Sequence, residues 1–174
     1  MKWVMLIGGV LVGVVVLVAV VGAMLPVRHV AARTARVGRP PAEVFALVTD
    51  FGGAARWRSD LERVELLPAR HGHPAFREHG RHGATTMEVD ELTAPERLVV
   101  RIADPDLPFG GTWTWELRPD GAGTAVTITE RGEVKNPIFR FLSRFVFGHT
   151  ATIDKVLGDL GRHWGETVSP SAAG

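Results

Sequence analysis

The sequence predicts an α+β protein: a curved antiparallel β-sheet wrapped around a long C-terminal helix, with one transmembrane helix at the N-terminus. Three observations predict it. The chain opens on an uninterrupted apolar run, short alternating segments separated by turn residues fill its middle, and a stripe of apolar residues at helical spacing ends it. Strand, helix, several strands and a final helix is an order typical of an antiparallel sheet with helices on one side.

The composition limits the class of protein. The chain has 174 residues, which is enough for one ordinary domain and an appendage. Its formal net charge of +1 is not typical of nucleic-acid-binding proteins, so no nucleic-acid partner is expected. Because cysteine and tyrosine are absent, disulfides, thiolate catalysis, cysteine-ligated zinc and tyrosine general acids are excluded.

The apolar run Trp3–Leu25 contains no charged residue. As a helix it is roughly 34 Å long, enough for the ~30 Å hydrocarbon core of a bilayer. We therefore assign residues 1–26 to a single-pass membrane anchor, which makes the membrane an expected partner. A cleaved signal peptide is the alternative, because Val21–Ala23 resembles a cleavage site, although the run is longer than the usual core of such a peptide.

The charges beside this run predict its orientation. Only Lys2 precedes it, whereas arginines follow it closely at Arg28, Arg33, Arg36 and Arg39. Because positive charge accumulates on the cytoplasmic side of a span, the domain is expected at the cell membrane, in the cytoplasm. Export is the alternative, since exported proteins also begin with a lysine and an apolar run.

Residues 27–168 form the expected globular domain, which begins with a strand and a helix. The stretch HVAARTARV alternates loosely and ends at Gly38. RPPAEVFALVTDF predicts a helix, because Pro41 suits a first helical turn and apolar residues recur behind it. A short helical or irregular piece carrying Trp57 follows.

Several short strands are expected next, each bounded by residues suited to tight turns. They cover residues 63–68, 75–82, 84–92, 97–103, 110–118 and 124–133. The PDGAG sequence before the last of them predicts a hairpin. In GTWTWEL, the side chains of Trp113, Trp115 and Leu117 point to one face of the strand. That face is either a packed core or the wall of a cavity.

The chain ends in a predicted long helix. Asn136 is a suitable N-cap and Pro137 a suitable first helical residue. An apolar stripe that includes one histidine follows, and Gly148 allows a bend. The stripe consists of Ile138, Leu142, Phe145, His149, Ile153, Val156, Leu160 and Trp164. Residues 169–174, SPSAAG, are expected to be a disordered tail.

Three stretches resemble the START/Bet v 1-like (SRPBCC) superfamily and its polyketide cyclase/dehydrase-like family. They are VGRPPAEVFALVTDFGGAARW, ELTAPERLVVRI, and GTWTWELRPDGAGTAVTITERGEV with the helix after it. The resemblance covers about residues 30–167 and implies a helix-grip fold. The superfamily includes lipid carriers, hormone receptors, cyclases and ubiquinone-binding proteins, so the fold does not assign one function.

The resemblance also implies a cavity between the sheet and the terminal helix, which would bind a hydrophobic small molecule. The candidate ligand-binding residues are Trp57, Trp113, Trp115, Leu117, Leu142, Phe145, His149 and Ile153. A solid core without a usable cavity is the alternative. No cofactor is implied.

Titratable groups on the inner face are the candidates for catalysis. His149 lies within the apolar stripe, and Glu130 shares its strand parity with Val126 and Ile128. A buried glutamate near a histidine could act as an acid/base pair. A hydrogen-bonded core histidine is the simpler interpretation of His149. No catalytic residue of the family maps onto this chain.

The stretch RHGHPAFREHGRHG is rich in histidine and arginine. Its histidines, His71, His73, His79 and His82, lack a known metal-ligand spacing, so no metal is expected. We interpret it as a solvated basic hairpin tip. At a cytoplasmic membrane surface its arginines, Arg70, Arg77 and Arg81, could meet anionic lipid headgroups.

These features lead to three hypotheses. The first is a membrane-anchored domain that binds a lipid, a quinone or isoprenoid, or an aromatic metabolite; a tether would hold its cavity where apolar ligands are concentrated. The second is a cyclase or dehydratase acting on a polyketide-like substrate in the same cavity. The third is a scaffold without a ligand. The sequence leaves the oligomeric state open.

Overall fold

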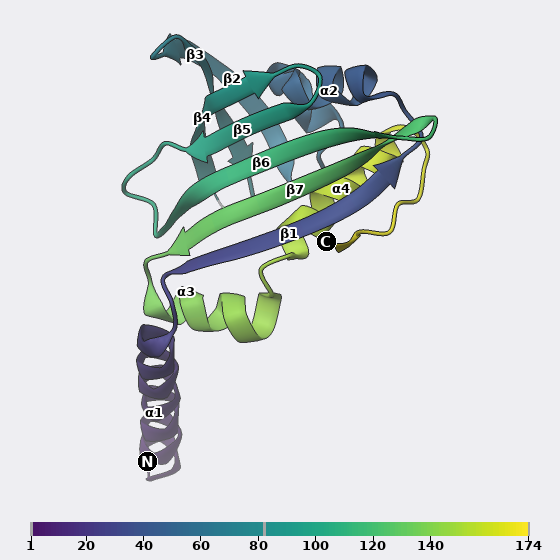
Figure 1. Cartoon of the computed structure of the whole chain (residues 1–174). Helices are drawn as coiled ribbons and strands as arrows, with labels where there is room; N and C mark the ends of the chain where they lie inside the picture. The colour runs from purple at the N-terminus through teal and green to yellow at the C-terminus, as the bar shows by residue number, and fades with distance from the viewer. Residues whose placement is uncertain (1, 82, 174) are drawn as a thin grey trace.

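The computed structural model describes residues 2–81 and 83–173 and has one curved antiparallel sheet in the order β2-β3-β4-β5-β6-β7-β1-β8. The strands are β1 (Arg28–Val37), β2 (Leu61–Arg70), β3 (His73–Gly80), β4 (Gly83–Thr93), β5 (Arg97–Ile102), β6 (Phe109–Asp120), β7 (Gly123–Val134) and β8 (Ser171–Ala172). The helices are α1 (Lys2–Met24), α2 (Pro41–Thr49), the 3-10 helix η1 (Phe51–Arg56), α3 (Pro137–Leu142), the π-helix η2 (Ser143–Phe147) and α4 (Ala151–His163). The sheet curves around α4, and α1 projects away from the domain (Figure 1).

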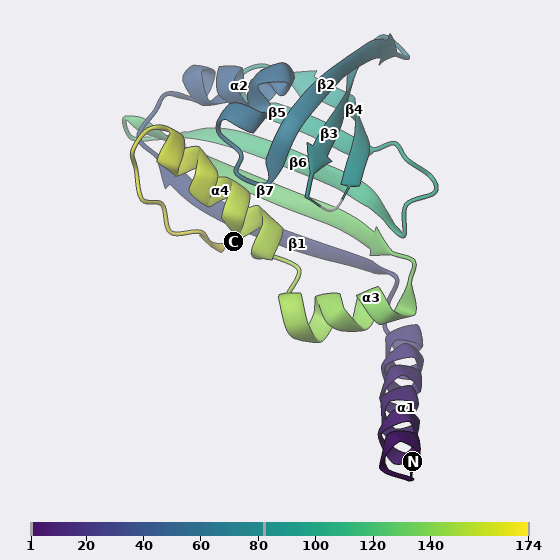
Figure 2. The same ribbon diagram turned by 180° about the vertical axis from the view of Figure 1, so that it is seen from behind.

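The core lies between the sheet and α4, which Figure 2 shows in front of β1 and β7. Ile153, Leu157 and Leu160 of α4 are fully buried. The inward side chains of β6 that meet this layer include Trp115 and Leu117, which are also buried. Burial of each such side chain contributes about 1.5–3 kcal/mol. The alternating pattern of GTWTWEL therefore predicts the inner face of β6 correctly.

The predicted strands, hairpin and helix starts are confirmed. The chain reverses between Asp120 and Gly123, which pair across β6 and β7, and Gly121 adopts the positive φ that the turn requires. Pro41 occupies the first turn of α2. The Asn136 side chain caps α3 by accepting hydrogen bonds from the backbone N–H groups of residues 138 and 139.

The prediction of one long C-terminal helix is wrong in its first half. The helix ends in η2 and breaks at Gly148, whose φ of 75° lies in the left-handed region, before α4 starts at Ala151. Only the second half of the predicted stripe, from Ile153 onward, continues into the core. Phe145 is exposed, and no residue of α3 or η2 is buried. A helical stripe in the sequence does not reveal such a break, because glycine also occurs inside helices.

The predicted disorder of the tail is also wrong for the part of it that the structure describes. Ser171 and Ala172 form β8 and pair with β1. The Arg33 side chain donates a hydrogen bond to the carbonyl of Pro170 at 2.8 Å. The edge of β1 offers free backbone groups to any neighbouring chain, so even a polar segment can pair there.

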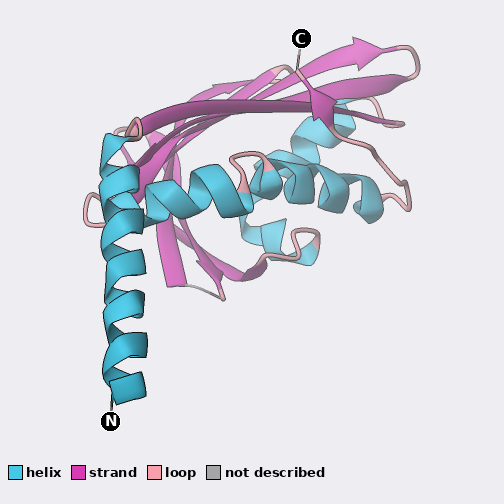
Figure 3. Cartoon of the chain, turned by 90° about the horizontal axis from the view of Figure 1, so that it is seen from below, coloured by secondary structure: helices cyan, strands magenta, loops and turns pink. Residues whose placement is uncertain are grey.

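Helix α1 is largely exposed before its C-terminal end and includes the one stretch among the described residues, Met5–Met24, that is long and apolar enough to cross a membrane. Its C-terminal end packs across α3 (Figure 3). A Cβ atom at Gly22 would stand 1.9 Å from the carbonyl oxygen of Pro137, so the two backbones touch. The VGA stretch that resembles a cleavage site is thus part of an intramolecular contact.

Candidate functional site

Three titratable side chains meet at the end of the concave face nearest α1. The Nε2 atom of His29, on β1, lies 3.5 Å from Oε1 of Glu130 on β7. On its other side, the His29 ring stacks on His149, which follows Gly148, with ring centroids 4.0 Å apart. We call this set the Glu130–His29–His149 cluster. It brings both catalytic candidates of the sequence to one place, with His29 between them.

Strand alternation and one glycine position His29. Ala31, Ala35 and Val37 are buried on the inner face of β1, and His29 shares their parity. Its register partner on β7 is Gly132. A Cβ atom there would stand 2.4 Å from Cε1 of His29 and 2.9 Å from Oε1 of Glu130. Glycine is therefore required for the imidazole to lie flat on the sheet beside the carboxylate.

The surroundings shift the pKa values of all three groups toward their neutral forms. Burial raises the pKa of Glu130, and a hydrogen bond from Trp113 partly offsets this effect. Burial lowers the pKa of His29. Burial, followed by the charges of His29 and Arg144, lowers the pKa of His149. An uncharged carboxyl and two uncharged imidazoles can donate and accept hydrogen bonds and can transfer protons, which suits either a polar ligand group or acid/base chemistry.

A pocket of about 210 Å³ adjoins this cluster on the side of α1. Its basic lining residues are Arg28, His29, Arg140, Arg144 and His149, and its apolar ones are Leu25, Pro26, Val27 and Val134. Among the described residues that line it there is no carboxylate. The pocket therefore carries positive charge at the point where the apolar helix joins the domain.

The predicted ligand-binding residues divide into four groups. Trp57, Trp115, Leu117 and Ile153 are buried in the core, and the Trp57 indole N–H has no hydrogen-bond partner among the described residues. Trp113 is partly buried and faces Glu130 in register. Leu142 is partly exposed and Phe145 is exposed. Of the eight, only His149 lines the pocket just described. A second pocket, near Asp104 and Phe109, is lined by none of them.

His29 is not among the candidate residues that the sequence predicts. A signal for it exists, because His29 falls on the same parity as the alanines of its strand. The alternation of HVAARTARV is weak, however, since alanine and arginine dominate it. The register with β7, which brings His29 to Glu130 across about a hundred residues of chain, depends on long-range pairing.

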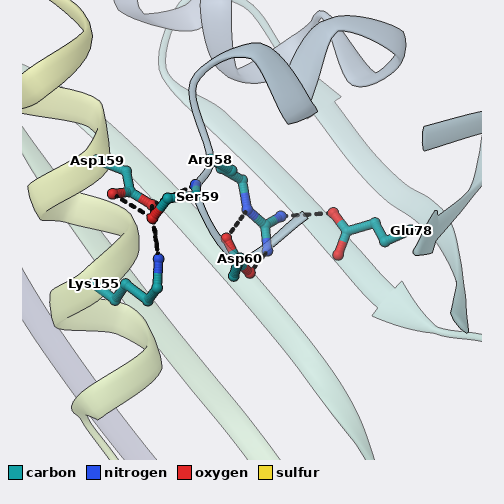
Figure 4. A network of polar contacts seen from close by, with 6 residues as sticks. All are labelled: Arg58, Ser59, Asp60, Glu78, Lys155 and Asp159. Carbon is teal, nitrogen blue, oxygen red and sulfur yellow. Dashed lines mark hydrogen bonds and ion pairs between the residues drawn. The ribbon is translucent and has the colours of Figure 1, made fainter. Parts of the chain in front are cut away.

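A second polar network lies between η1, α4 and β3 (Figure 4). The carboxylate of Asp159 is buried and accepts two hydrogen bonds from Ser59. One comes from the Ser59 hydroxyl and the other from the Ser59 backbone N–H, at 2.8 Å. Lys155 donates to the same hydroxyl. The Ser59 hydroxyl thus donates to one side chain and accepts from the other. The network clamps the chain after η1 onto α4.

Beside this clamp, Arg58 joins Asp60 and Glu78, each at 2.6 Å. Burial raises the pKa of Glu78, and the Arg58 charge partly offsets this effect. Glu88 likewise forms ion pairs, with Arg70 and Arg101. Neither glutamate contacts the Glu130–His29–His149 cluster.

The histidine-rich hairpin lies at the opposite end of the domain from α1 (Figures 1 and 2). Because α1 leaves the domain at the other end, the expectation that the hairpin's arginines meet a membrane stays a prediction. Residues 2–81 and 83–173 contain no group of three His, Asp or Glu side chains placed to hold a metal ion. His82 lies outside the described residues.

Comparisons with known proteins agree with this architecture. The family model described as polyketide cyclase/dehydrase and lipid transport matches residues 28–163. A solved structure from Thermus thermophilus is similar at 25% identity and a TM-score of 0.60, covering 76% of this chain and 93% of that one. No curated protein matches the chain.

Two further structures show the same fold. The Zhui aromatase/cyclase from a Streptomyces species shares 18% identity at a TM-score of 0.59, over 80% of this chain and 99% of that one. A START superfamily protein from Mycobacterium smegmatis shares 18% identity at a TM-score of 0.59, over 74% of this chain and 94% of that one. The helix-grip expectation is confirmed by these matches and by the curved sheet.

Proposed function

Because the chain belongs to the polyketide cyclase/dehydrase and lipid transport family, we propose that it is a membrane-anchored domain that binds a hydrophobic ligand bearing one polar group. The observation that carries the proposal is the Glu130–His29–His149 cluster, which occupies a half-buried position where the inner face would otherwise continue as apolar core. Groups whose pKa values burial shifts toward their uncharged forms, beside apolar surface, suit a hydroxyl or carbonyl of a lipid, quinone or aromatic metabolite.

Apolar surface lies beside the cluster. Trp113 is partly buried and pairs with Glu130 in register, and the pocket next to His29 and His149 is lined by Leu25, Pro26, Val27 and Val134 as well as by arginines. The segment α3–η2 contributes no buried residue to the core. Helix α1 would hold this pocket close to the bilayer, where apolar ligands are concentrated.

An enzyme remains the second candidate, favoured by one observation. Glu130 and His29 lie 3.5 Å apart with pKa values moved in opposite directions by burial, and such pairs can act as general acid and base. Cyclisation or dehydration of a polyketide-like substrate would need proton transfer of this kind.

The first experiment is to purify the full chain in nanodiscs, extract bound compounds with organic solvent and identify them by mass spectrometry. The E130Q/H149Q variant is compared with wild type, and Glu62→Gln, an exposed change on β2, is the matched control. We expect to extract the same compound from wild type and from both variants. Its occupancy in E130Q/H149Q should be lower than in wild type by about fivefold or more per lost hydrogen bond.

The alternatives give different results. An enzyme would yield a chemically different, unprocessed compound from E130Q/H149Q and its product from wild type. A clean apo protein in every sample, with no uptake from a panel of lipids and quinones, would contradict ligand binding and favour the ligand-free scaffold.

A further inference from the structure

The segment α3–η2 carries large apolar side chains that the rest of the described chain leaves exposed. They are Ile138, Phe139, Phe145, Val146 and Phe147, with 38–63% of their surface accessible. No residue of either helix is buried, so the sheet does not use this face. Several large exposed apolar side chains on one short segment indicate an interaction surface.

The position of the segment identifies what covers it. α3 crosses the C-terminal end of α1, and the Gly22–Pro137 contact and a 2.8 Å hydrogen bond from Arg140 to the Leu25 carbonyl hold them together. Figure 3 shows the two helices crossing. When α1 spans a bilayer, its end defines the boundary between acyl chains and headgroups. The exposed phenylalanines of α3–η2 are therefore held at that boundary.

The arginines beside the C-terminal end of α1 have a charge that suits an anionic lipid headgroup. Arg28, Arg140 and Arg144 line the pocket beside α1, with no carboxylate among its described lining residues. The Nε atom of Arg140 is buried and has no hydrogen-bond partner within the described chain. A volume of about 210 Å³ is below the ~300 Å³ of a typical small-molecule site but sufficient for a phosphate group with its substituent. Guanidinium groups suit phosphate oxygens geometrically.

We propose that α3–η2 is an interfacial membrane element, with its phenylalanine side chains in the acyl region and the Arg28–Arg140–Arg144 pocket on the phosphate of an anionic lipid of the same bilayer. This inference rests on the membrane anchoring in the proposed function and extends it. Amphipathic helices with basic and aromatic residues commonly lie in the interface in this way. It would place the pocket beside His29 and His149 against the membrane, so that a ligand enters from lipid rather than from water.

The absence of cysteine allows a direct test with single-cysteine variants of the full chain. Phe145→Cys and Phe147→Cys are each labelled with an environment-sensitive fluorophore in nanodiscs of phosphatidylcholine with phosphatidylglycerol. Ala122→Cys, at the exposed β6–β7 turn far from α1, is the control. We expect doxyl-labelled lipid to quench the labels at 145 and 147, and aqueous iodide to quench the label at 122.

Other outcomes overturn the inference. Iodide quenching at 145 and 147 in a chain that stays in the nanodisc contradicts the interfacial element but leaves the anchor intact. Protection from both quenchers means that protein, such as a second copy, covers the face. A chain that does not remain in nanodiscs contradicts both the anchor and the inference.

The headgroup contact has its own readout. Native mass spectrometry of chains released from the nanodiscs measures how much phosphatidylglycerol each chain retains relative to phosphatidylcholine. Arg144→Gln should reduce this ratio about fivefold, whereas Arg118→Gln, which removes the same charge from an exposed site on β6, should not. Equal ratios for the two variants would exclude a specific headgroup site.

Discussion

At the scale of single residues, Gly132 decides the geometry of the candidate site. It lets the His29 ring approach the sheet so closely that Nε2 reaches Glu130 on one side and the ring stacks on His149 on the other. The space left by Gly132 thus positions the cluster.

We predict that Gly132→Ala destabilises the fold by about 1–3 kcal/mol, because its methyl group would overlap the imidazole of His29. The variant should also lose the retained ligand. Gly158→Ala is the matched control: it lies inside α4 with open space around it, so the same substitution should raise stability by up to ~1 kcal/mol. Urea unfolding measures both. Equal stability of Gly132→Ala and wild type would show that the imidazole can move aside at no cost.

At the scale of elements, the clamp between η1 and α4 holds the helix on the sheet. Asp159 is fully buried, yet it accepts hydrogen bonds from the backbone and hydroxyl of Ser59 and from Arg162. Burial alone raises the pKa of Asp159, but these hydrogen bonds outweigh it and hold that pKa below its usual value. The carboxylate is therefore ionised and stabilises the folded chain.

Asp159→Ala should lower the free energy of unfolding by about 3 kcal/mol, since it leaves the Ser59 N–H and nearby cations without their acceptor. Asp154→Ala on the same helix removes a more accessible ion pair with Arg33 and should cost less than about 1 kcal/mol. Similar losses in the two variants, measured by urea unfolding at neutral pH, would contradict the clamp.

The pH dependence follows from the same carboxylate. The folded pKa of Asp159 lies below the unfolded value of about 3.9, so the unfolded chain binds more protons in that range. Its stabilisation is complete above about pH 4 and is lost as the pH falls through the folded pKa. Asp159→Ala should therefore lose less stability than wild type between pH 6 and pH 3. If the free energy of unfolding falls with pH equally in Asp159→Ala and in wild type, other carboxyl groups cause the loss of stability in acid.

At the scale of the whole molecule, the contact between α1 and α3 sets the position of the domain relative to α1 and, under the proposed anchoring, relative to the membrane. The two helices touch at Gly22, where no side chain separates the backbones. The Glu130–His29–His149 cluster, the basic pocket beside it and the exposed phenylalanines all lie at this end of the domain.

We predict that Gly22→Val separates α1 from α3 and increases amide hydrogen exchange in residues 137–147 by about tenfold or more, with exchange in the sheet unchanged. Gly13→Val is the control, because nothing lies within 4 Å of a Cβ atom there. Exchange is measured by mass spectrometry on the full chain in nanodiscs. If both variants exchange like wild type, the helix contact does not hold α3 in place.

Much of the candidate site could not be predicted along the chain. The strand parity of Glu130 and the place of His149 in the helical stripe are patterns over a few residues, so the sequence predicts both residues as candidates. His29 was missed because its strand alternates weakly, and the basic pocket was missed because its arginines come from both ends of the chain. Phe145 was assigned to a ligand cavity because a continuous helix was assumed through Gly148.

The sequence by itself determined the elements whose signal is local: the apolar helix, the alternating strands, the PDGAG hairpin and the buried stripe of α4, because side-chain periodicity and turn chemistry act over a few residues. The tertiary structure alone decided that the helix breaks at Gly148, that the tail pairs with β1, and that His29, Glu130 and His149 meet. Those features depend on pairing and close approach between segments about a hundred residues apart, which backbone register and the space left by glycine control.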